Sequence, residues 1–507
     1  MFPLKIRVLL FAATFVLACI LVNAQDRAEP GIKDLSKFDP RRPLIRELQT
    51  SVQDGFRLVA VGDCIISRSL SQYAIREPGF AQSIRILKEG DVTYGNLETS
   101  VIDMRTFTGS PYTGIDDVPL VADPSVAKDL VTMGFNMMSR ANNHALDWGI
   151  EGLRETSHWT DQAGLITAGV GENQGLARSA HYYEGTKGRV GIVSVASTFR
   201  PSSEALPAQG ASPGRPGVSG LALKKTVVVP PRVMRVLQTL VQELYPETFP
   251  RSASDDKDPR DKLTVFDTKF EVGARRSLRY EINAADLAGI LKAVRQGKEH
   301  SDFLLVTIHS HEPADTTSPD AKNDFADTPG EFVHTLANAA IDAGADAFLT
   351  TGIHHLGPIE IYKGRPIFYG LGNFFWSDIQ EPMPADFYAQ YRDSLLAAFT
   401  HPEMATDADL TNLLNADYFA GELPFESVIT ESRFDHGHVA EIRLYPVDLG
   451  YGMKLTESGI PRAASAERAM KILKHLQAIS TPYGTQLEIE STQDWHYIGI
   501  IRPRMEN

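Results

Sequence analysis

The chain has 507 residues, of which 43% are hydrophobic, and its formal net charge is −14. This length predicts one large α/β domain with additions, or two domains. The acidic balance argues against nucleic acid or an anionic membrane surface as the main partner, although it leaves room for a local basic site. The two cysteines, Cys19 and Cys64, imply no disulfide framework, and we expect Cys64 to be a small buried residue.

Residues 1–24 have the three regions of a secretory signal peptide. Two basic residues precede the apolar run Val8–Val22, and Ala24 ends a small-x-small cleavage pattern. The alternative is an uncleaved membrane anchor, and lipid modification of Cys19 is a weaker one. In each case we expect a secreted or cell-envelope protein whose body works outside the cytoplasm.

Beyond a polar, proline-bearing linker at 25–54, the chain alternates short apolar runs with amphipathic segments, as α/β proteins do. Helices are predicted at 83–89, 123–133 (with Asp123 as N-cap), 149–163, 283–298, 330–343 and 464–479. Strands are predicted at 56–61 (stopped by Gly62-Asp63), 189–195, 303–308, 347–350, 358–362, 366–369 (a hairpin around Lys363-Gly364), 439–446 and 488–502.

Two stretches interrupt a main domain that we expect to span 55–451. The first, near 221–280, has no clear periodicity, and its charged middle, 246–262, predicts partial disorder. The second, near 377–425, is irregular with helical patches. Residues 452–507 are predicted to form a C-terminal extension with one helix and strands.

The polar loop Ser139–Gly149 is the stretch around which the chemistry is organised, because it follows a predicted strand end. An asparagine carbonyl, as in Asn142 or Asn143, is a hard neutral metal ligand, and His144 beside it can donate a proton. Alternatively, the two asparagines are turn formers and His144 caps the following helix. Taken alone, the loop leaves the two interpretations balanced.

Other loops shift that balance towards a metal site. They carry Asp63, Glu98, His309 and His354, each on the C-terminal side of a predicted strand. Parallel strands would gather these loops at one edge of a sheet. Carboxylates, amides and imidazoles suit one or two divalent ions such as Mn, Zn or Fe, whereas the missing cysteines exclude a thiolate site. A pair of ions would activate a water and hold a phosphoryl or acyl oxygen.

Five motifs in this order resemble those of the CapA family of capsule and poly-γ-glutamate biosynthesis proteins, a branch of the calcineurin-like metallophosphoesterases. The similarity runs from about residue 56 to 374, and the asparagine-histidine loop and the Y-x-L-G-N-F stretch are its most specific parts. The motifs are G-D-x-x-x-x-R (62–68), N-L-E-T (96–99), A-N-N-H-A-L-D-W-G (141–149), I-H-S-H-E (308–312) and G-x-H…P-I-E-I-Y-x-G-R-P-I-F-Y-G-L-G-N-F (352–374).

The resemblance implies an α/β fold, a metallophosphoesterase-like sandwich of two mixed β-sheets flanked by helices. It implies that Glu98 bridges two ions, and it gives the metal ligands as Asp63, Glu98, Asn143, His309 and His354.

It also implies that His144 is the general acid, and that Arg68 and Asn142 steady the substrate or the loops. Asp147 either orients His144 or caps the next helix, and Arg215 is a candidate for reaching the substrate from a basic loop.

Two departures from the superfamily pattern bear on the number of ions. The first loop usually carries D-x-H, but here Asp63 is followed by Cys64 and Ile65, so one imidazole is missing. The final loop matches well only at His354. His311 stands where many relatives have glycine, which adds a candidate ligand.

We therefore expect a metal-dependent hydrolase-type protein of the CapA kind that acts in polyglutamate capsule synthesis outside the cytoplasm. In the expected mechanism, an ion-activated water attacks and His144 protonates the leaving group. The partner would be a phosphoester substrate or an anionic polymer, with a membrane synthase complex as a further partner and no nucleic acid. The alternatives are a non-catalytic envelope module that binds the polymer or the synthase complex, and a hydrolase of nucleotide or sugar phosphates.

Overall fold

The structure is a computed structural model that describes residues 48–112, 119–244, 261–265, 268–312, 329–377, 396–417 and 421–503. The predicted leader and most of the predicted linker lie outside these residues. The described residues belong to one compact unit, Leu48–Asn507. A search of the described helices finds none that is both long enough and apolar enough to cross a membrane.

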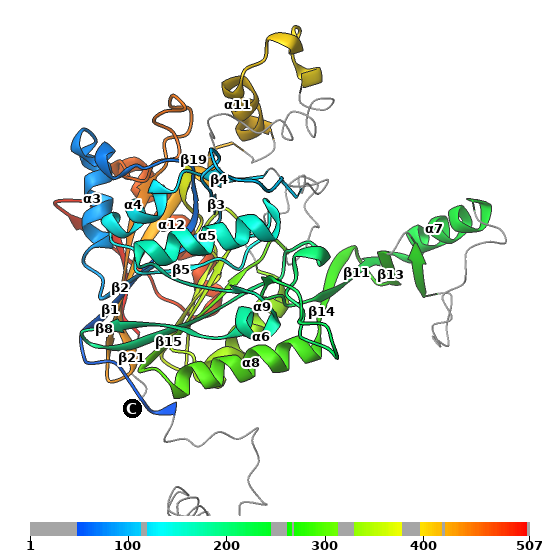
Figure 1. The fold of residues 1–507 in the computed structure, drawn as a ribbon, viewed down its shortest axis with the longest axis horizontal. Coiled ribbons are helices and arrows are strands. Elements are labelled where there is room, and N and C mark those ends of the chain that lie inside the picture. Colours follow the sequence, from blue (N-terminus) through cyan, green and yellow to red (C-terminus); the bar gives the residue numbers. More distant parts are fainter. Residues whose placement is uncertain are drawn as a thin grey trace, which may run out of the picture. The chain divides into compact units, whose positions relative to one another are not determined.

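Two mixed sheets form the centre of the fold (Figure 1). The ten-stranded sheet runs in the order β23-β24-β21-β20-β1-β2-β5-β6, with β19 beside β1 and β22 beside β21. Its strands are β1 (Phe56–Ile66), β2 (Val92–Leu97), β5 (Met137–Ser139), β6 (Ile166–Ala168), β19 (Asn373–Ser377), β20 (Glu426–Asp435), β21 (His438–Asp448), β22 (Arg462–Ala463), β23 (Glu488–Thr492) and β24 (His496–Ile501).

The six-stranded sheet runs in the order β17-β18-β16-β15-β9-β8. Its strands are β8 (His181–Gly185), β9 (Gly188–Ala196), β15 (Phe303–His309), β16 (Ala347–Thr351), β17 (Ile359–Tyr362) and β18 (Arg365–Phe368). Strands β9, β15 and β16 are parallel, so their carboxyl ends meet at one edge. The predicted hairpin is confirmed, because β17 and β18 pair antiparallel around Lys363 and Gly364, both at positive φ.

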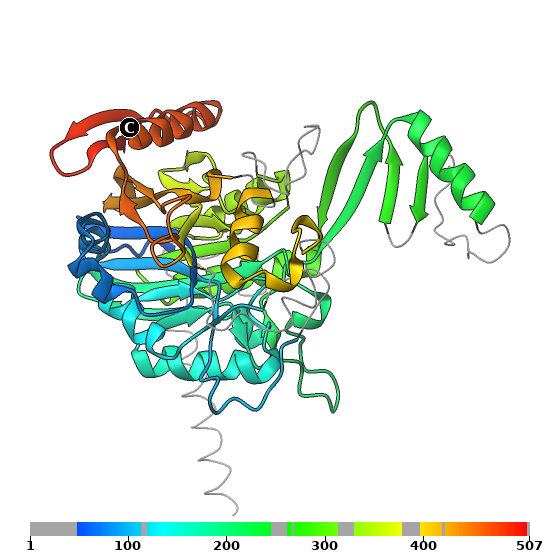
Figure 2. The same cartoon turned by 90° about the horizontal axis from the view of Figure 1, so that it is seen from above.

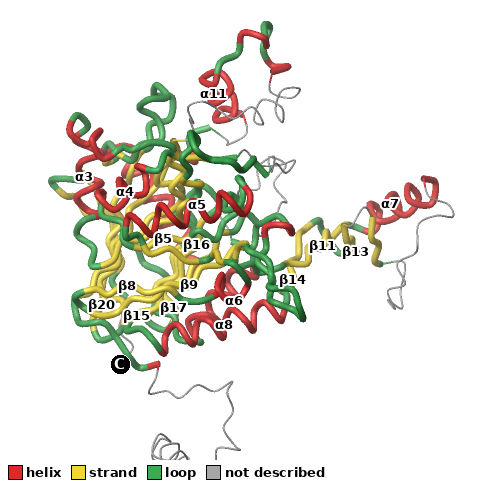
Figure 3. The backbone as a smooth tube through the Cα atoms, in the orientation of Figure 1, coloured by secondary structure: helices red, strands yellow, loops and turns green. Residues whose placement is uncertain are grey.

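Helices cover the outer faces of the two sheets (Figures 1 and 3). These helices are α3 (Pro78–Leu87), α4 (Ser125–Met133), α5 (Gly149–Ala163), α6 (Gln174–Arg178), α8 (Ala284–Glu299) and α9 (Glu331–Asp342). Helix α12 (Ala466–Ser480) instead contacts β21, β24 and β17 and packs its apolar side chains into the core between the two sheets. The helix at 149–163 has its predicted bounds. Helix α4 is assigned from Ser125, and Asp123 caps its start as predicted, because Asp123 Oδ1 accepts a hydrogen bond from the backbone amide of Ser125 (2.9 Å) and Pro124 already has helical φ and ψ.

Alternating side chains of the strands build three apolar layers. Leu58 of β1 and Leu305 of β15 belong to a core between the sheets. Val59 of β1 packs in a second core with residues of α3 and α4, and Val306 of β15 packs in a third with residues of α8 and α9. This arrangement confirms the predicted sandwich of two mixed sheets flanked by helices.

Strand β1 does not stop at Gly62-Asp63 as predicted but continues to Ile66. A Cβ on Gly62 would lie 1.8 Å from the carbonyl oxygen of Gly372, so only glycine permits the close approach of these two backbones. The pairing of β1 with β19 then shifts register between Asp63 and Cys64. This irregularity lets the side chain of Asp63 meet residues of the second sheet, while Cys64 stays buried in the first.

The insertion near 221–280 is more regular than predicted. Its described residues form a separate four-stranded sheet in the order β12-β13-β11-β14, together with helix α7 (Figure 2). The elements are β11 (Leu223–Val229), α7 (Pro231–Leu244), β12 (Lys262–Val265), β13 (Thr268–Val272) and β14 (Ser277–Ile282). Short β-branched runs such as that in β11 escape a search for long periodicity, and the stretch predicted to be disordered lies almost wholly outside the described residues.

The remaining short elements connect the main layers. The second excursion contains α11 (Asp407–Asp417) between irregular segments, as predicted, although 378–395 lie outside the described residues. The C-terminal extension joins the ten-stranded sheet, because β24 pairs with β21. Two-residue strands are β3 (Ser100–Val101), β4 (Val121–Ala122), β7 (Val170–Gly171) and β10 (Gly217–Val218), and 3₁₀ turns are η2 (Ser71–Ile75), η3 (Pro201–Ser203), η4 (Leu396–Ala398), η5 (Pro402–Met404), η6 (Leu423–Phe425) and η7 (Thr481–Tyr483).

Candidate metal centre

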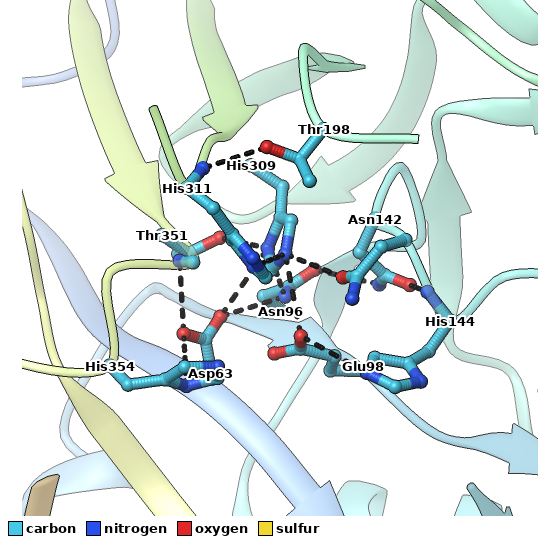
Figure 4. Close-up of polar contacts among 12 residues, drawn as sticks. Asp63, Asn96, Glu98, Asn142, His144, Thr198, His309, His311, Thr351 and His354 are labelled. Atoms are coloured by element: carbon cyan, nitrogen blue, oxygen red, sulfur yellow. Dashed lines mark hydrogen bonds and ion pairs between the residues drawn. The ribbon is translucent and has the colours of Figure 1, made fainter. Parts of the chain in front are cut away.

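The predicted ligands come together where strands of both sheets end (Figure 4). In the ten-stranded sheet, Asp63 lies in β1 and Glu98 directly follows β2. In the six-stranded sheet, His309 ends β15 and His354 follows β16. The site therefore spans the two sheets, and the rigid strand ends fix the backbone on each side.

Asp63, Glu98 and His309 form the first group that could hold a metal ion. Their ligand atoms lie within 4.8 Å of one another, and all three residues are buried. His309 Nε2 lies 3.3 Å from Glu98 Oε1, and its Nδ1 lies 3.7 Å from Asp63 Oδ1. Asn143 Oδ1 lies 2.9 Å from the same Nε2, so its carbonyl points to this group as well.

Glu98, His311 and His354 form the second group, again with ligand atoms within 4.8 Å of one another. Glu98 belongs to both groups, as expected of a carboxylate that bridges two ions. His311 is held by its backbone amide, which donates to Thr198 Oγ1 (2.8 Å), and its Nε2 lies 2.9 Å from His309 Nε2. The extra histidine in the fourth loop therefore completes the second group.

The charge of this cluster fits a cation. Asp63 and Glu98 are 0% exposed. Burial, reinforced by the neighbouring imidazoles, holds the pKa values of His309 and His311 well below the usual range, and burial also lowers the pKa of His354. Neutral imidazoles and carboxylates are the protonation states that bind metal, and buried carboxylates require a compensating positive charge. The donor set of oxygen and imidazole nitrogen suits Mn, Zn or Fe.

Backbone and amide groups fix the orientation of Asp63. Its Oδ2 accepts a hydrogen bond from the backbone amide of Gly352 (3.0 Å). Its Oδ1 accepts from Asn96 Nδ2 (2.8 Å), and Asn96 Oδ1 accepts in turn from Asn142 Nδ2 (3.2 Å). Asn142 also donates to the carbonyl of Leu97 (2.9 Å), so its amide ties the central loop to the Glu98 loop.

Asn373 determines which nitrogen of His354 faces the site. The Nδ2 of Asn373 donates to the carbonyls of His354 (3.3 Å) and Pro424 (3.0 Å), which leaves its Oδ1 towards His354 Nδ1 at 2.8 Å. His354 Nδ1 must then carry the proton and donate it, so Nε2 keeps its lone pair for a metal. His354 also has a φ of 54°, a strained backbone conformation for a non-glycine residue.

His144 lies at the edge of the cluster, with Asp147 behind it. His144 Nδ1 lies 2.7 Å from Asp147 Oδ2, and its Nε2 lies 4.0 Å from Glu98 Oε1. Asp147 Oδ2 also accepts from the backbone amide of Leu120 (2.8 Å). Helix α5 has Trp148 as its N-cap and no side-chain cap. Of the two roles that the sequence left open for Asp147, the geometry therefore favours orientation of His144.

Two of the predicted site residues make their contacts elsewhere. Arg68 is exposed, and its guanidinium donates to the carbonyl of Thr456 (2.8 Å). Arg215 donates to the carbonyls of Glu204 (2.8 Å) and Pro201 (2.6 Å) within its own loop. Neither contact brings a cation to the cluster, so a substrate role for these arginines stays a prediction.

Sequence reasoning missed several residues that support the site. Asn96 and Asn373 were visible only as members of the motifs N-L-E-T and Y-x-L-G-N-F. No sequence pattern indicated a role for Arg200, yet its guanidinium lies 4.0 Å from Asp147 Oδ1. Glu312, the last residue of the motif at 308–312, accepts hydrogen bonds from the hydroxyls of Ser197, Thr198 and Ser310 and so joins two loops.

Comparison with known proteins gives the family. The model of the family described as bacterial capsule synthesis protein PGA_cap matches residues 57–377. The chain is 41% identical over 463 residues to a Sinorhizobium fredii (strain NBRC 101917 / NGR234) protein named Uncharacterized protein y4sH, which covers 89% of this chain and 94% of that protein.

Two relatives have names that state a role. The chain is 24% identical to the PGA biosynthesis protein CapA of Bacillus subtilis (strain 168), over 65% of each protein. It is 22% identical to the capsule biosynthesis protein CapA of Bacillus anthracis, over 62% of this chain and 59% of that protein. The chain belongs to the bacterial capsule synthesis protein family PGA_cap.

Proposed function

We propose that this protein is a metal-dependent hydrolase of the phosphoesterase type that acts in polyglutamate capsule biosynthesis outside the cytoplasm. The observation that carries the proposal is the pair of ligand groups that share Glu98, next to a histidine oriented by a buried carboxylate. Two adjacent cation sites and a proton donor are what cleavage of a phosphoester requires.

The metal ligands in this proposal are Asp63, Glu98, Asn143, His309 and His354, with His311 added from the geometry. Divalent ions bound there would supply a nucleophilic water and neutralise the charge of a phosphoryl group. Asn96, Asn142 and Asn373 keep the ligands in place, since each amide joins one ligand loop to another or fixes a ligand's orientation.

His144 is the proposed general acid. The Asp147 carboxylate accepts the Nδ1 proton of His144, which stabilises the imidazolium and leaves the Nε2 proton directed towards the cluster. As the P–O bond to the leaving group breaks, the Nε2 proton passes to the leaving oxygen, and the neutral imidazole that remains is reprotonated from solvent. The guanidinium of Arg200, at 4.0 Å from Asp147 Oδ1, places a positive charge beside that carboxylate.

The substrate class and the location rest on the family and on the N-terminal sequence. The names of the two CapA relatives point to a polymer of glutamate, whose carboxylates suit a site that carries cations. The predicted leader at 1–24 would export the chain. The proposed substrate is a phosphoester linked to polymer synthesis, attachment or export, and a membrane synthase complex is the proposed partner.

Phosphodiesterase assays on the purified chain loaded with Mn²⁺ test the proposal, with bis(p-nitrophenyl) phosphate as the substrate. We expect turnover that falls about 10²–10⁴-fold in His144→Ala, the range for loss of a general acid, with the bound metal unchanged. His158→Ala is the matched control, because His158 lies exposed on α5. Equal rates in His144→Ala and the parent chain would contradict the assigned role.

The same experiment decides the second candidate function, a non-catalytic module that binds the polymer through its ions. The missing histidine of the first loop favours this non-catalytic candidate. Cys64 and Ile65 are buried, and the loop supplies only Asp63 to the cluster. That candidate predicts bound metal, retention of poly-γ-glutamate on the metal-loaded chain, and no turnover of phosphodiesters or phosphomonoesters.

A further inference from the structure

Helix α7 in the first insertion exposes a row of apolar side chains. Val233, Val236, Leu240 and Leu244 are 36%, 67%, 43% and 55% exposed. Their spacing of three and four residues places them on one side of the helix. Elsewhere among the described residues, large exposed apolar side chains occur singly or in pairs on separate elements, so this row is the most extended.

The row is distinct from the face that α7 uses for packing. Met234 is 1% exposed, and Leu237 and Val241 are half-buried, on the side where α7 contacts β12 and β13. The helix is thus apolar over a wider arc than its own sheet covers. Packing among the described residues of the insertion explains the inner part of this arc and leaves the outer part exposed.

The insertion is also basic within an acidic chain. Its described residues between 221 and 282 carry nine lysines and arginines against four acidic residues, and the whole stretch carries twelve against nine, whereas the chain has a net charge of −14. Arg232 and Arg235 lie in the first turns of α7, and Arg275 and Arg276 follow β13. Val229 and Val272 are paired, so all four arginines lie at the same end of the small sheet.

We propose that this insertion docks on an anionic phospholipid surface, with the apolar row of α7 in the interfacial layer and the four arginines against lipid phosphates. An interfacial helix combines apolar side chains with basic residues in this way. A soluble polyanion would pair with the arginines but leave the apolar row in water. A second copy of the chain could cover the row with its own α7, but that contact would not account for the basic excess of the insertion.

This inference does not depend on the metal centre. The acidic composition argued against a membrane surface as the main partner of the whole chain, but it allowed a local basic site, and the insertion is one. Docking through α7 would hold a capsule protein at the membrane independently of residues 1–24.

Vesicle flotation tests the proposal. The chain from Gln25, which keeps the whole unit Leu48–Asn507, is mixed with phosphatidylglycerol-containing or pure phosphatidylcholine vesicles. We expect at least about tenfold stronger binding to the anionic vesicles at about 0.1 M salt, and a loss of that preference at about 1 M salt, where charges are screened.

Paired variants separate the two sides of the helix. Val236→Asp/Leu240→Asp should weaken binding to anionic vesicles about tenfold or more, because it puts charge into the interfacial layer. Thr239→Asp/Gln242→Asp adds the same charge on the polar side of α7, and its effect should stay within about threefold. Arg275→Glu/Arg276→Glu should abolish the preference for anionic lipid. Circular dichroism and bound metal, unchanged in all variants, would show that they fold.

Four results would overturn the proposal. The first is no binding of the parent chain to anionic vesicles. The second is an equal loss of vesicle binding in both aspartate double variants. The third is a loss of vesicle binding only in the arginine variant, together with tight binding of the parent chain to poly-γ-glutamate, which would make the insertion a polyanion site. The fourth is a dimer in sedimentation experiments that the Val236→Asp/Leu240→Asp variant dissociates.

Discussion

Strand β15 has a buried charged cluster at each end, and the two clusters are built differently. At its start, the ammonium of Lys298, 1% exposed, donates to Asp346 Oδ2 (2.7 Å) and to the carbonyls of Thr50 (2.8 Å) and Asp302 (2.9 Å). At its end, His309 meets two buried carboxylates. The chain supplies a cation to the first cluster from its own sequence, whereas the second contains carboxylates and imidazoles whose pKa values are lowered.

This difference indicates which of the two clusters needs a cation from outside the chain. Lys298 uses all three of its donors within the fold, so its cluster is complete without any ligand. The cluster around Glu98 gains its positive charge from outside the chain in our account. Mutations in the first cluster should therefore lower the free energy of unfolding, whereas mutations in the second should weaken metal binding.

The largest expected effect is on the complete cluster. Lys298→Met removes a buried ammonium from Asp346 and from the carbonyls of Thr50 and Asp302, and it leaves Asp346 only the partly exposed Arg365 at 3.3 Å, so the free energy of unfolding should fall by about 3–5 kcal/mol. Urea denaturation measures this loss, and metal bound per folded chain should not change. Lys292→Met is the control, because Lys292 lies exposed on the same helix. A decrease of less than about 1 kcal/mol in the free energy of unfolding would contradict the view that Lys298 completes its cluster.

Metal should stabilise the second cluster by a similar amount. At about a thousand times the dissociation constant, Mn²⁺ or Zn²⁺ should raise the free energy of unfolding by about 4 kcal/mol. Glu98→Gln removes the shared ligand and should abolish this gain, while Lys298→Met should keep it. Glu151→Gln, at an exposed position of α5, serves as the control. An equal metal-induced gain in Glu98→Gln would show that the ion binds elsewhere.

A smaller effect is expected from the residue that orients His354. Asn373→Ala should weaken metal binding about 10–100-fold, because the Nδ1 proton of His354 loses its acceptor. Competition with a chelator measures the affinity. Ser427→Ala is the matched control, since it removes a buried hydrogen bond to the Leu371 carbonyl without touching a ligand. Equal affinities in the two variants would contradict the role of Asn373.

The smallest effect of a single substitution is expected in the pH dependence of the metal-free protein. His309, His311 and His354 have lowered pKa values, so below pH 6.5 the unfolded chain binds protons that the folded chain does not. Stability is then fully present above pH 6.5 and is lost as the pH falls towards the folded pKa values, by at most about 1.4 kcal/mol per pH unit for each histidine. His311→Asn should flatten this slope in urea titrations, and His158→Asn should not.

The sequence predicted those parts of the site that follow from local order. Glu98, Asn143, His309 and His354 each lie at or shortly after a strand end, and parallel strands must bring such ends together. Asp63 joins them from inside β1, at the register shift. The same reasoning predicted the sandwich and the hairpin at Lys363-Gly364. These features depend on alternation and turn residues, which a single sequence displays.

Long-range contacts could not be predicted in this way. No local sequence signal indicates that Gly62 lies against Gly372. The strand predicted at 56–61 therefore ends before the observed end of β1. Likewise, no spacing rule brings Arg200 to Asp147. The strands of the insertion could not be predicted, because each is short and belongs to a small separate sheet. Its side chains are only partly buried, so the apolar residues show no clear period.

The most direct test of the central claim is a crystal structure of the Mn²⁺-loaded protein with anomalous scattering. We expect anomalous peaks within ligand distance of Asp63, Glu98 and His309 and of Glu98, His311 and His354, with the Glu98 carboxylate between them. Loaded crystals without a peak at either group would contradict it.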